Sequence, residues 1–186
     1  LAFINYGGIQ AIQTLWAGPW MLNISGYTPL QSATGLFWIN ITMLISYFIW
    51  GYILPKISDY GINSIKLIKL GLPISYFSLS LIIYFGNNAG AFLFTIYIMT
   101  SIVISLTQPA IALNFSKNLA GKSLTSFNVF LFSGTFFVQW GIGLIIDLCN
   151  NKGFDILSSY RISFSLFLFL CVLSYTFFIY LNKNEN

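Results

Sequence analysis

The fold is decided by residues 123–147, which read SLTSFNVFLFSGTFFVQWGIGLIID. No charged residue interrupts this stretch before Asp147. At 1.5 Å per residue, a helix of this length exceeds the roughly 30 Å hydrocarbon core of a bilayer. Residues 123–147 therefore predict a helix that crosses a membrane.

One face of this predicted helix is polar. Asn128, Thr135 and Gln139 are spaced i, i+7 and i+11, which places Thr135 and Gln139 each within about 20° of Asn128 around the helix axis. Gly134 and Gly141, also seven residues apart, form a smooth stripe beside them. An amide face and a glycine face predict packing against other helices, with the amides facing something polar between them.

The composition of the whole chain is that of an integral membrane protein. Of its 186 residues, 57% are hydrophobic and only 6% are charged, whereas a soluble domain has about 25% charged residues. So few charges could not cover a folded surface in water. The net charge of +4 comes without a basic cluster interleaved with aromatic residues, so we expect no nucleic-acid partner.

Residues that carry catalysis or bind metals are scarce. Histidine is absent, and the four acidic residues are scattered along the chain. Cys149 follows one predicted helix and Cys171 lies in the middle of another, a difference in depth that exceeds the reach of a disulfide. We therefore expect no enzyme, no metal, no cofactor and no disulfide.

Six apolar segments divide the chain, each near the roughly 20 residues needed to span a bilayer. Pro55 is expected to end the second segment, and Pro109 to kink the fourth. Leu1 is already in apolar sequence, so we expect the chain to begin inside a helix and to be part of something longer. The predicted helices are about 1–22, 32–54, 65–85, 90–113, 124–147 and 160–181.

Basic residues predict the orientation in the membrane. Six of the eight Lys and Arg residues fall in loops or at helix ends on one side, which the positive-inside rule makes cytoplasmic. Both termini of the chain are then expected in the cytoplasm. The six are Lys56, Lys66, Lys69, Lys117, Lys122 and Lys183.

Amide side chains are shared unevenly among the predicted helices. They occur in the first, second, fourth and fifth, and are absent from the third and sixth. Because an unpartnered amide in hydrocarbon is costly, we expect the third and sixth helices to face mostly lipid. Each Gln could either bond a neighbouring helix or line a cavity. The amide-bearing faces hold Tyr6, Gln10, Gln13 and Ala17 in the first helix, and Ser101, Ser105, Gln108 and Ala112 in the fourth.

Two stretches of the chain carry a family resemblance. Residues 7–20 read GGIQAIQTLWAGPW, and residues 121–128 read GKSLTSFN and continue to Asp147. They resemble the seventh and eleventh helices of a bacterial group within the major facilitator superfamily. Residues 51–56 resemble a loop of that family more weakly, because Pro55 stands where the family often has Asp.

The resemblance implies that the chain is helices seven to twelve of a twelve-helix transporter in the bacterial inner membrane, with the N-terminal half absent. A small solute would bind near mid-membrane between the two halves, which rock to alternate access. In this superfamily the seventh and tenth helices line the cavity, and the eighth and eleventh flank it. The implied solute contacts are Gln10, Gln13, Trp16, Gln108, Asn128 and Gln139.

Other functions stay open at this point. The main alternative is an independent six-helix protein, such as a channel or a small dimeric carrier. A coupling ion such as a proton normally needs an ionisable group within the membrane, and no predicted span holds one deep inside. A coupling carboxylate would then belong to the missing half.

Overall fold

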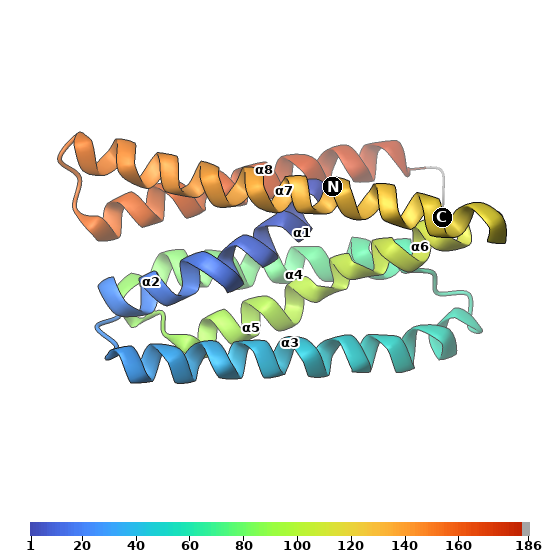
Figure 1. Ribbon diagram of the computed structural model, residues 1–186, viewed down its shortest axis with the longest axis horizontal. Helices are drawn as coiled ribbons and strands as arrows, with labels where there is room; N and C mark the ends of the chain where they lie inside the picture. Colours follow the sequence, from blue (N-terminus) through green and yellow to red (C-terminus); the bar gives the residue numbers. More distant parts are fainter. Residues whose placement is uncertain (184–186) are drawn as a thin grey trace.

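The computed structural model describes residues 1–183, and these form only helices and short connections (Figure 1). Five of the helical stretches are long and apolar enough to cross a membrane. The elements are α1 (Ala2–Ala11), the π turn η1 (Ile12–Trp16), α2 (Ala17–Asn23), α3 (Pro29–Ser58), α4 (Ser64–Phe85), the 3-10 turn η2 (Gly86–Asn88), α5 (Ala91–Ser101), the 3-10 turn η3 (Ile102–Leu106), α6 (Thr107–Leu113), α7 (Lys117–Asn151) and α8 (Ile156–Leu181).

The predicted helix boundaries need two corrections in α3. The helix begins at Pro29 because Thr28 and Gln31 form a capping box, in which each side chain accepts from the other residue's backbone N–H. It also continues past Pro55 to Ser58, so the predicted end at Pro55 is wrong. A proline removes only its own hydrogen bond, and a long membrane helix tolerates this loss.

The fourth predicted helix is interrupted close to the expected place. The 3-10 turn η3 separates α5 from α6 and ends three residues before Pro109. Pro109 has no N–H to donate to the carbonyl of Ser105, which lies within η3. The missing bond accounts for the loss of α-helical geometry in this turn.

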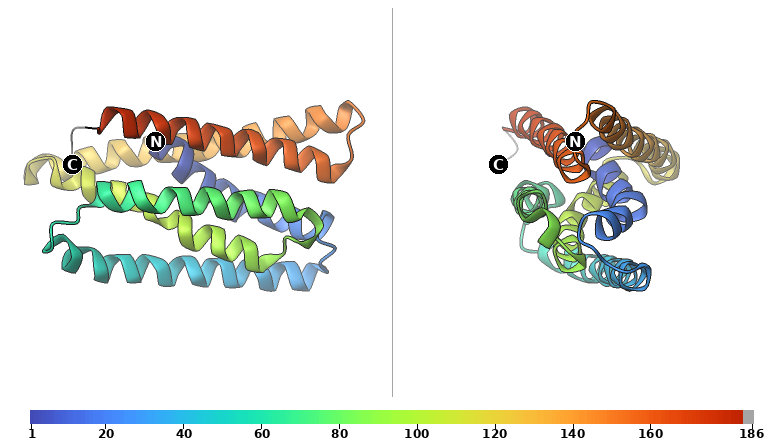
Figure 2. Two further views of the ribbon diagram at one scale, coloured as in Figure 1. Left: turned by 180° about the vertical axis from the view of Figure 1, so that it is seen from behind. Right: turned by 90° about the vertical axis from the view of Figure 1, so that its left-hand side faces the viewer.

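The helices form a bundle with two unequal sides. In the end view of Figure 2, α7, the Ala2–Asn23 stretch and α3 lie along one side, α4 and α8 lie along the other, and α5 lies between them. We call the first side the open face. In the spanning parts, 39% of α4 is buried, against 17% for α3 and 22% for α8, so the third predicted helix is more enclosed than the second.

A close backbone contact joins α1 to α7 through two glycines. A Cβ atom built on Gly7 would stand 2.5 Å from the carbonyl carbon of Gly134, and one built on Gly134 would clash with the backbone of Phe3. The predicted packing role of Gly134 is therefore confirmed. The same prediction for Gly141 is wrong, since nothing lies within 4 Å of a Cβ built there.

A buried hydrogen-bond network ties α1 to the back of the bundle. Asn5 is 5% exposed; its Nδ2 donates to Ser174 Oγ of α8 over 3.0 Å, and its Oδ1 accepts from the Tyr76 hydroxyl of α4 over 2.9 Å. Both polar atoms of the amide are satisfied, as an apolar surrounding requires. The two cysteines are free, as predicted.

Charges gather at the two ends of the bundle. The α3–α4 and α6–α7 connections lie at one end of the bundle (Figure 1), where the Asn182 carbonyl accepts from Lys69 Nζ. Lys152, directly after α7, and Arg161, which donates to the last carbonyls of α4, lie at the other end. Leu1 lies part-way along the bundle, since Phe3 packs on Phe130 and Phe137 with ring centroids 4.9 and 5.8 Å apart.

Two contacts fix the ends of α4 and α8. Arg161 Nε and Nη2 donate to the carbonyl oxygens of Ile83 and Tyr84 over 2.9 and 2.8 Å, which satisfies acceptors that the end of α4 leaves free. Asp155 caps α8, and hydrogen bonds from the Ser158 hydroxyl and backbone N–H lower the pKa of its carboxyl.

We expect Gly134→Val to destabilise the protein by about 1–3 kcal/mol, because the side chain forces α1 away from α7. Thermal unfolding in detergent measures the effect. Gly141→Val is the matched control, since it places the same side chain on the same helix in open space. Equal losses in the two variants would contradict the close contact.

We expect Arg161→Ala to destabilise the protein by about 1–3 kcal/mol, because two carbonyls at the end of α4 lose a charged donor. The unfolding temperature in detergent reports the loss. Lys152→Ala is the control, since Lys152 is an exposed basic residue at the same end of the bundle. A loss no larger than in this control would show that the contact contributes nothing to stability.

Candidate functional site

Polar side chains converge where the first helix widens into the π turn. Gln13 leaves η1 toward α3, and its Nε2 donates to Asn40 Oδ1. Asn40 in turn donates from Nδ2 to the carbonyl of Leu36 over 2.7 Å. The pair bonds two helices that are separated in sequence by an entire loop.

The next residues of the π turn bond to α7. Gln139 Nε2 donates to Thr14 Oγ1 over 2.8 Å, and the Gln139 carbonyl accepts from Trp16 Nε1 over 3.3 Å. The Trp16 ring rests over Gly143, where a Cβ atom would stand 3.2 Å from the ring. One turn of helix thus bonds to both flanking helices of the open face.

Gln10 completes this group one turn earlier in α1. Its Nε2 donates to the Tyr6 hydroxyl over 3.3 Å, and its carbonyl accepts from Thr14 Oγ1 over 2.6 Å. Thr14 and Asn40 are exposed, and Gln10 and Gln139 are half-buried. We call Gln10, Gln13, Thr14, Asn40 and Gln139 the amide belt.

The amide belt lies near the middle of the membrane-spanning length. Asn40 is eleven residues from the start of α3 and Gln139 is twelve residues from the end of α7. At 1.5 Å per residue both lie roughly 16–18 Å from the same end of the bundle, close to half the roughly 30 Å hydrocarbon core. Amides at this depth need partners or a polar space.

The π turn changes which residues of the first helix share a face. Ala17 N–H donates to the carbonyl of Ile12, five residues back, so one extra residue is fitted into the turn. The predicted common face of Tyr6, Gln10, Gln13 and Ala17 is therefore wrong: Gln13 and Ala17 are buried, and Thr14 takes the exposed position after Gln10. The prediction assumed a regular α-helical period.

The structure separates the predicted contact residues into two groups. Gln10, Gln13, Trp16 and Gln139 lie together around the π turn. Gln108 is half-buried in α6, and Asn128 is exposed on α7, eleven residues or roughly 16 Å along the helix from Gln139. These last two residues are not part of the amide belt.

Two members of the belt were not among the predicted contacts. Asn40 was visible in the sequence only as an isolated amide of the second helix. Thr14 is four residues after Gln10, so a regular helix already places it within about 40° of Gln10. Its bond to Gln139 depends on how the first helix packs against α7, which no spacing within one segment signals.

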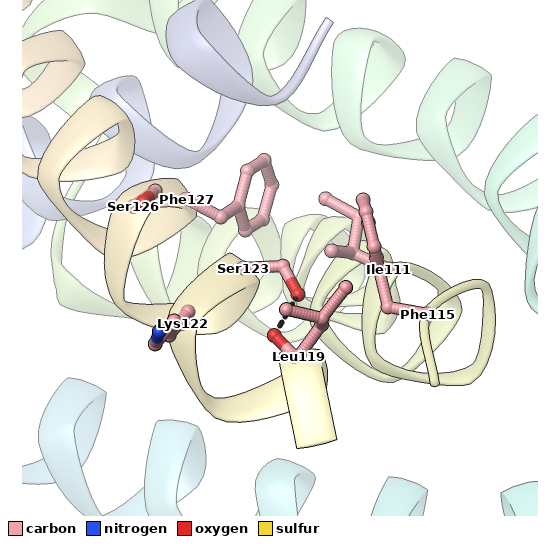
Figure 3. A pocket seen from close by; sticks show the side chains of 7 residues that line it. All are labelled: Ile111, Phe115, Leu119, Lys122, Ser123, Ser126 and Phe127. Atoms are coloured by element: carbon pink, nitrogen blue, oxygen red, sulfur yellow. Dashed lines mark hydrogen bonds between the residues drawn. The ribbon is translucent and has the colours of Figure 1, made fainter. Parts of the chain in front are cut away.

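A separate groove of about 570 Å³ lies between α6 and the start of α7. Figure 3 shows Ile111, Leu119 and Phe127 around it, with Lys122 at its edge. The Ser123 hydroxyl in the wall of this groove donates to the Leu119 carbonyl over 2.7 Å, so its hydrogen is already used within the helix. The groove is apolar, and it does not share a residue with the amide belt.

The belt contains amides, a hydroxyl and an adjoining indole, and none of its members is ionisable. No group of three or more His, Cys, Asp or Glu residues that could hold a metal occurs in the part of the chain that the structure describes. Comparison of the chain with protein-family models, curated proteins and solved structures gives no match in any of the three. The chemistry available at the belt is hydrogen bonding to a polar ligand.

We expect the Thr14–Gln139 bond to contribute a coupling free energy of roughly 0.6 kcal/mol, and at most about 1.7 kcal/mol, as for other hydrogen bonds between membrane helices. A double-mutant cycle of Thr14→Val and Gln139→Leu, followed by unfolding in detergent, measures this value. The control cycle pairs Thr14→Val with Asn128→Leu, and its effects should add. Additive effects in both cycles would contradict the bond.

Proposed function

We propose that the chain is the C-terminal half of a secondary transporter of the major facilitator type in the bacterial inner membrane. In this proposal the Ala2–Asn23 stretch is a sixth membrane span, and a second half of six helices covers the open face. A small solute binds between the halves, and alternating access moves it across. The end of the bundle that carries most of the lysines faces the cytoplasm.

The amide belt is the observation that carries this proposal. It places amides and a hydroxyl at mid-membrane depth on a face that stays partly exposed, and lipid satisfies none of these groups. Such groups in a membrane protein favour a water-filled space or a ligand path. A π turn at the same point supports the proposal, because these turns are frequent at functional sites.

Two further features agree with a half-transporter. The spanning part of α3 is only 17% buried, so much of this helix is free to meet another membrane segment. The Ala2–Asn23 stretch and the α5–η3–α6 stretch contact each other, and both are interrupted by a turn that is not α-helical. Interrupted helices around a mid-membrane site are typical of secondary transporters.

The belt also limits how the solute is held. Its members are uncharged, so this half provides hydrogen bonds rather than an ion pair. If the solute is charged or an ion is coupled to transport, the residue of opposite charge that binds it belongs to the second half. Gln108 and Asn128, toward the lysine-bearing end, would line the path to the cytoplasm rather than the binding position.

We expect Gln13→Leu and Gln139→Leu to reduce uptake by the complete transporter about tenfold each, the effect of losing roughly one hydrogen bond. Uptake of a panel of radiolabelled sugars, amino acids and organic acids measures this in cells that express the complete protein. Asn151→Leu is the control, since it removes an exposed amide at the end of α7, outside both the belt and the path to the cytoplasm. Expression of each variant is compared on immunoblots.

Wild-type uptake by both belt variants would exclude the belt as the binding position. In the alternative, a six-helix channel or a small dimeric carrier, a second copy of the chain covers the open face. Cross-linking of two copies of the chain through the open face in membranes would therefore favour the alternative over the proposal.

A further inference from the structure

A small, largely enclosed cavity lies where α1, α4, α5 and α8 meet. The volume available in it to the centre of a water molecule is about 10 Å³, roughly the least that one water needs. Its lining is unusually polar for the interior of a membrane bundle, and includes Asn5, Ser75, Tyr76, Tyr97 and Ser101. Cavities with polar walls bind water, whereas apolar ones stay dry.

Ser101, in the wall of this cavity, has an unused hydroxyl. It is 3% exposed, and its Oγ has no hydrogen-bond partner among the residues that the structure describes. Serines in helices often donate back to a carbonyl three or four residues earlier, as Ser75 and Ser78 do over 2.8 and 2.9 Å. The carbonyl four residues before Ser101 is that of Tyr97, and it already accepts from the Thr100 hydroxyl over 3.0 Å. A buried donor of this kind calls for a partner.

Two other oxygens in the lining residues have room for a further donor. Ser75 Oγ gives its hydrogen to the Leu72 carbonyl, and within the described part of the chain it accepts none. Asn5 Oδ1 accepts from the Tyr76 hydroxyl over 2.9 Å, which uses one of the two lone pairs of an amide oxygen. The cavity thus brings an unpaired donor of α5 close to spare acceptors of α4 and α1.

Water is the ligand that fits these groups. A water molecule accepts from one hydroxyl and donates its two hydrogens, which gives the roughly three hydrogen bonds that a buried water usually makes. The volume leaves no room for a larger molecule. The lining residues include no acidic side chain, so a cation at this depth would have no counter-charge to offset its desolvation.

We propose that this cavity binds one water molecule, which accepts from the Ser101 hydroxyl and donates to Asn5 Oδ1 and Ser75 Oγ. Ser101 is the last residue of α5 and directly precedes η3. The water therefore connects α1 and α4 to the point where the fourth predicted span loses its α-helical geometry. The site shares no residue with the amide belt, and the inference does not depend on the proposed function.

Ser101→Ala tests the proposal by the direction of its effect on stability. Loss of the hydroxyl deprives the water of a donor, so we expect the unfolding temperature in detergent to fall by roughly 2–4 °C. Without a water, the same variant removes an unsatisfied polar group, and the unfolding temperature stays constant or rises. Ser46→Ala is the matched control, because Ser46 is also buried but its hydroxyl bonds the Thr42 carbonyl of its own helix. A fall no larger than in this control overturns the proposal.

Radiolytic labelling of the same chain detects the water itself. X-ray pulses convert bound water into hydroxyl radicals that oxidise the side chains beside it, and mass spectrometry measures the oxidation of each residue. Tyr97 lines the cavity and is 3% exposed, whereas Tyr160 lies outside it and is 4% exposed. We expect Tyr97 to be oxidised several-fold faster than Tyr160. Ser101→Val removes the hydroxyl and fills part of the cavity, so it should lower the Tyr97 rate to that of Tyr160.

Equal oxidation of the two tyrosines in the unsubstituted protein, or a Tyr97 rate that Ser101→Val leaves unchanged, also overturns the proposal. Neither measurement requires uptake or a second half, because both report on the interior of this bundle. Failure of the transporter proposal in the uptake experiment would therefore leave the water site standing, and the reverse is equally true.

Discussion

The contact between the backbones of Gly7 and Gly134 is the constraint on which the arrangement of the open face depends. Without side chains at these two positions, α1 approaches α7 closely enough for Phe3 to pack on Phe130. This approach fixes where the following residues of the first helix run. It brings the π turn between α3 and α7, where its side chains reach both helices. A membrane bundle has little hydrophobic force to press helices together, so such close backbone packing is a main source of order.

The second constraint is that polar groups within the apolar layer must find partners. The Asn5 side chain meets this requirement completely, because its two polar atoms bond to α8 and α4. Its role is therefore structural: it connects α1 to these two helices. The belt meets the same requirement only in part, since Thr14 and Asn40 stay exposed and Gln13 keeps an unpaired oxygen. Asn5 and Gln13 carry the same amide group and lie on the same Ala2–Asn23 stretch. Their different degrees of satisfaction separate a structural role from a candidate binding role.

The proposed transporter combines these constraints. The glycine contact and the Asn5 network hold α1 against α7, α4 and α8, while the π turn that follows presents its polar side chains to α3 and α7. Because the belt is uncharged, other segments of the proposed transporter must provide any selectivity for ions and any coupling to them. The acidic and basic residues of this chain lie at or near the ends of its helices, which agrees with this division.

The sequence by itself determined the class of protein, the approximate helical segments, the free cysteines and the irregularity before Pro109, because hydropathy and proline geometry act locally. It also identified Gln10, Gln13, Trp16 and Gln139 as polar residues of the first and fifth segments. Only the tertiary structure decided that these four lie together, that Gly134 but not Gly141 packs against a neighbour, and that α4 is more buried than α3. The π turn belongs to the same class, since its extra residue is held by bonds to α7, more than a hundred residues away. Contacts between distant residues set helix register, and a periodic pattern read along one segment contains no information about them.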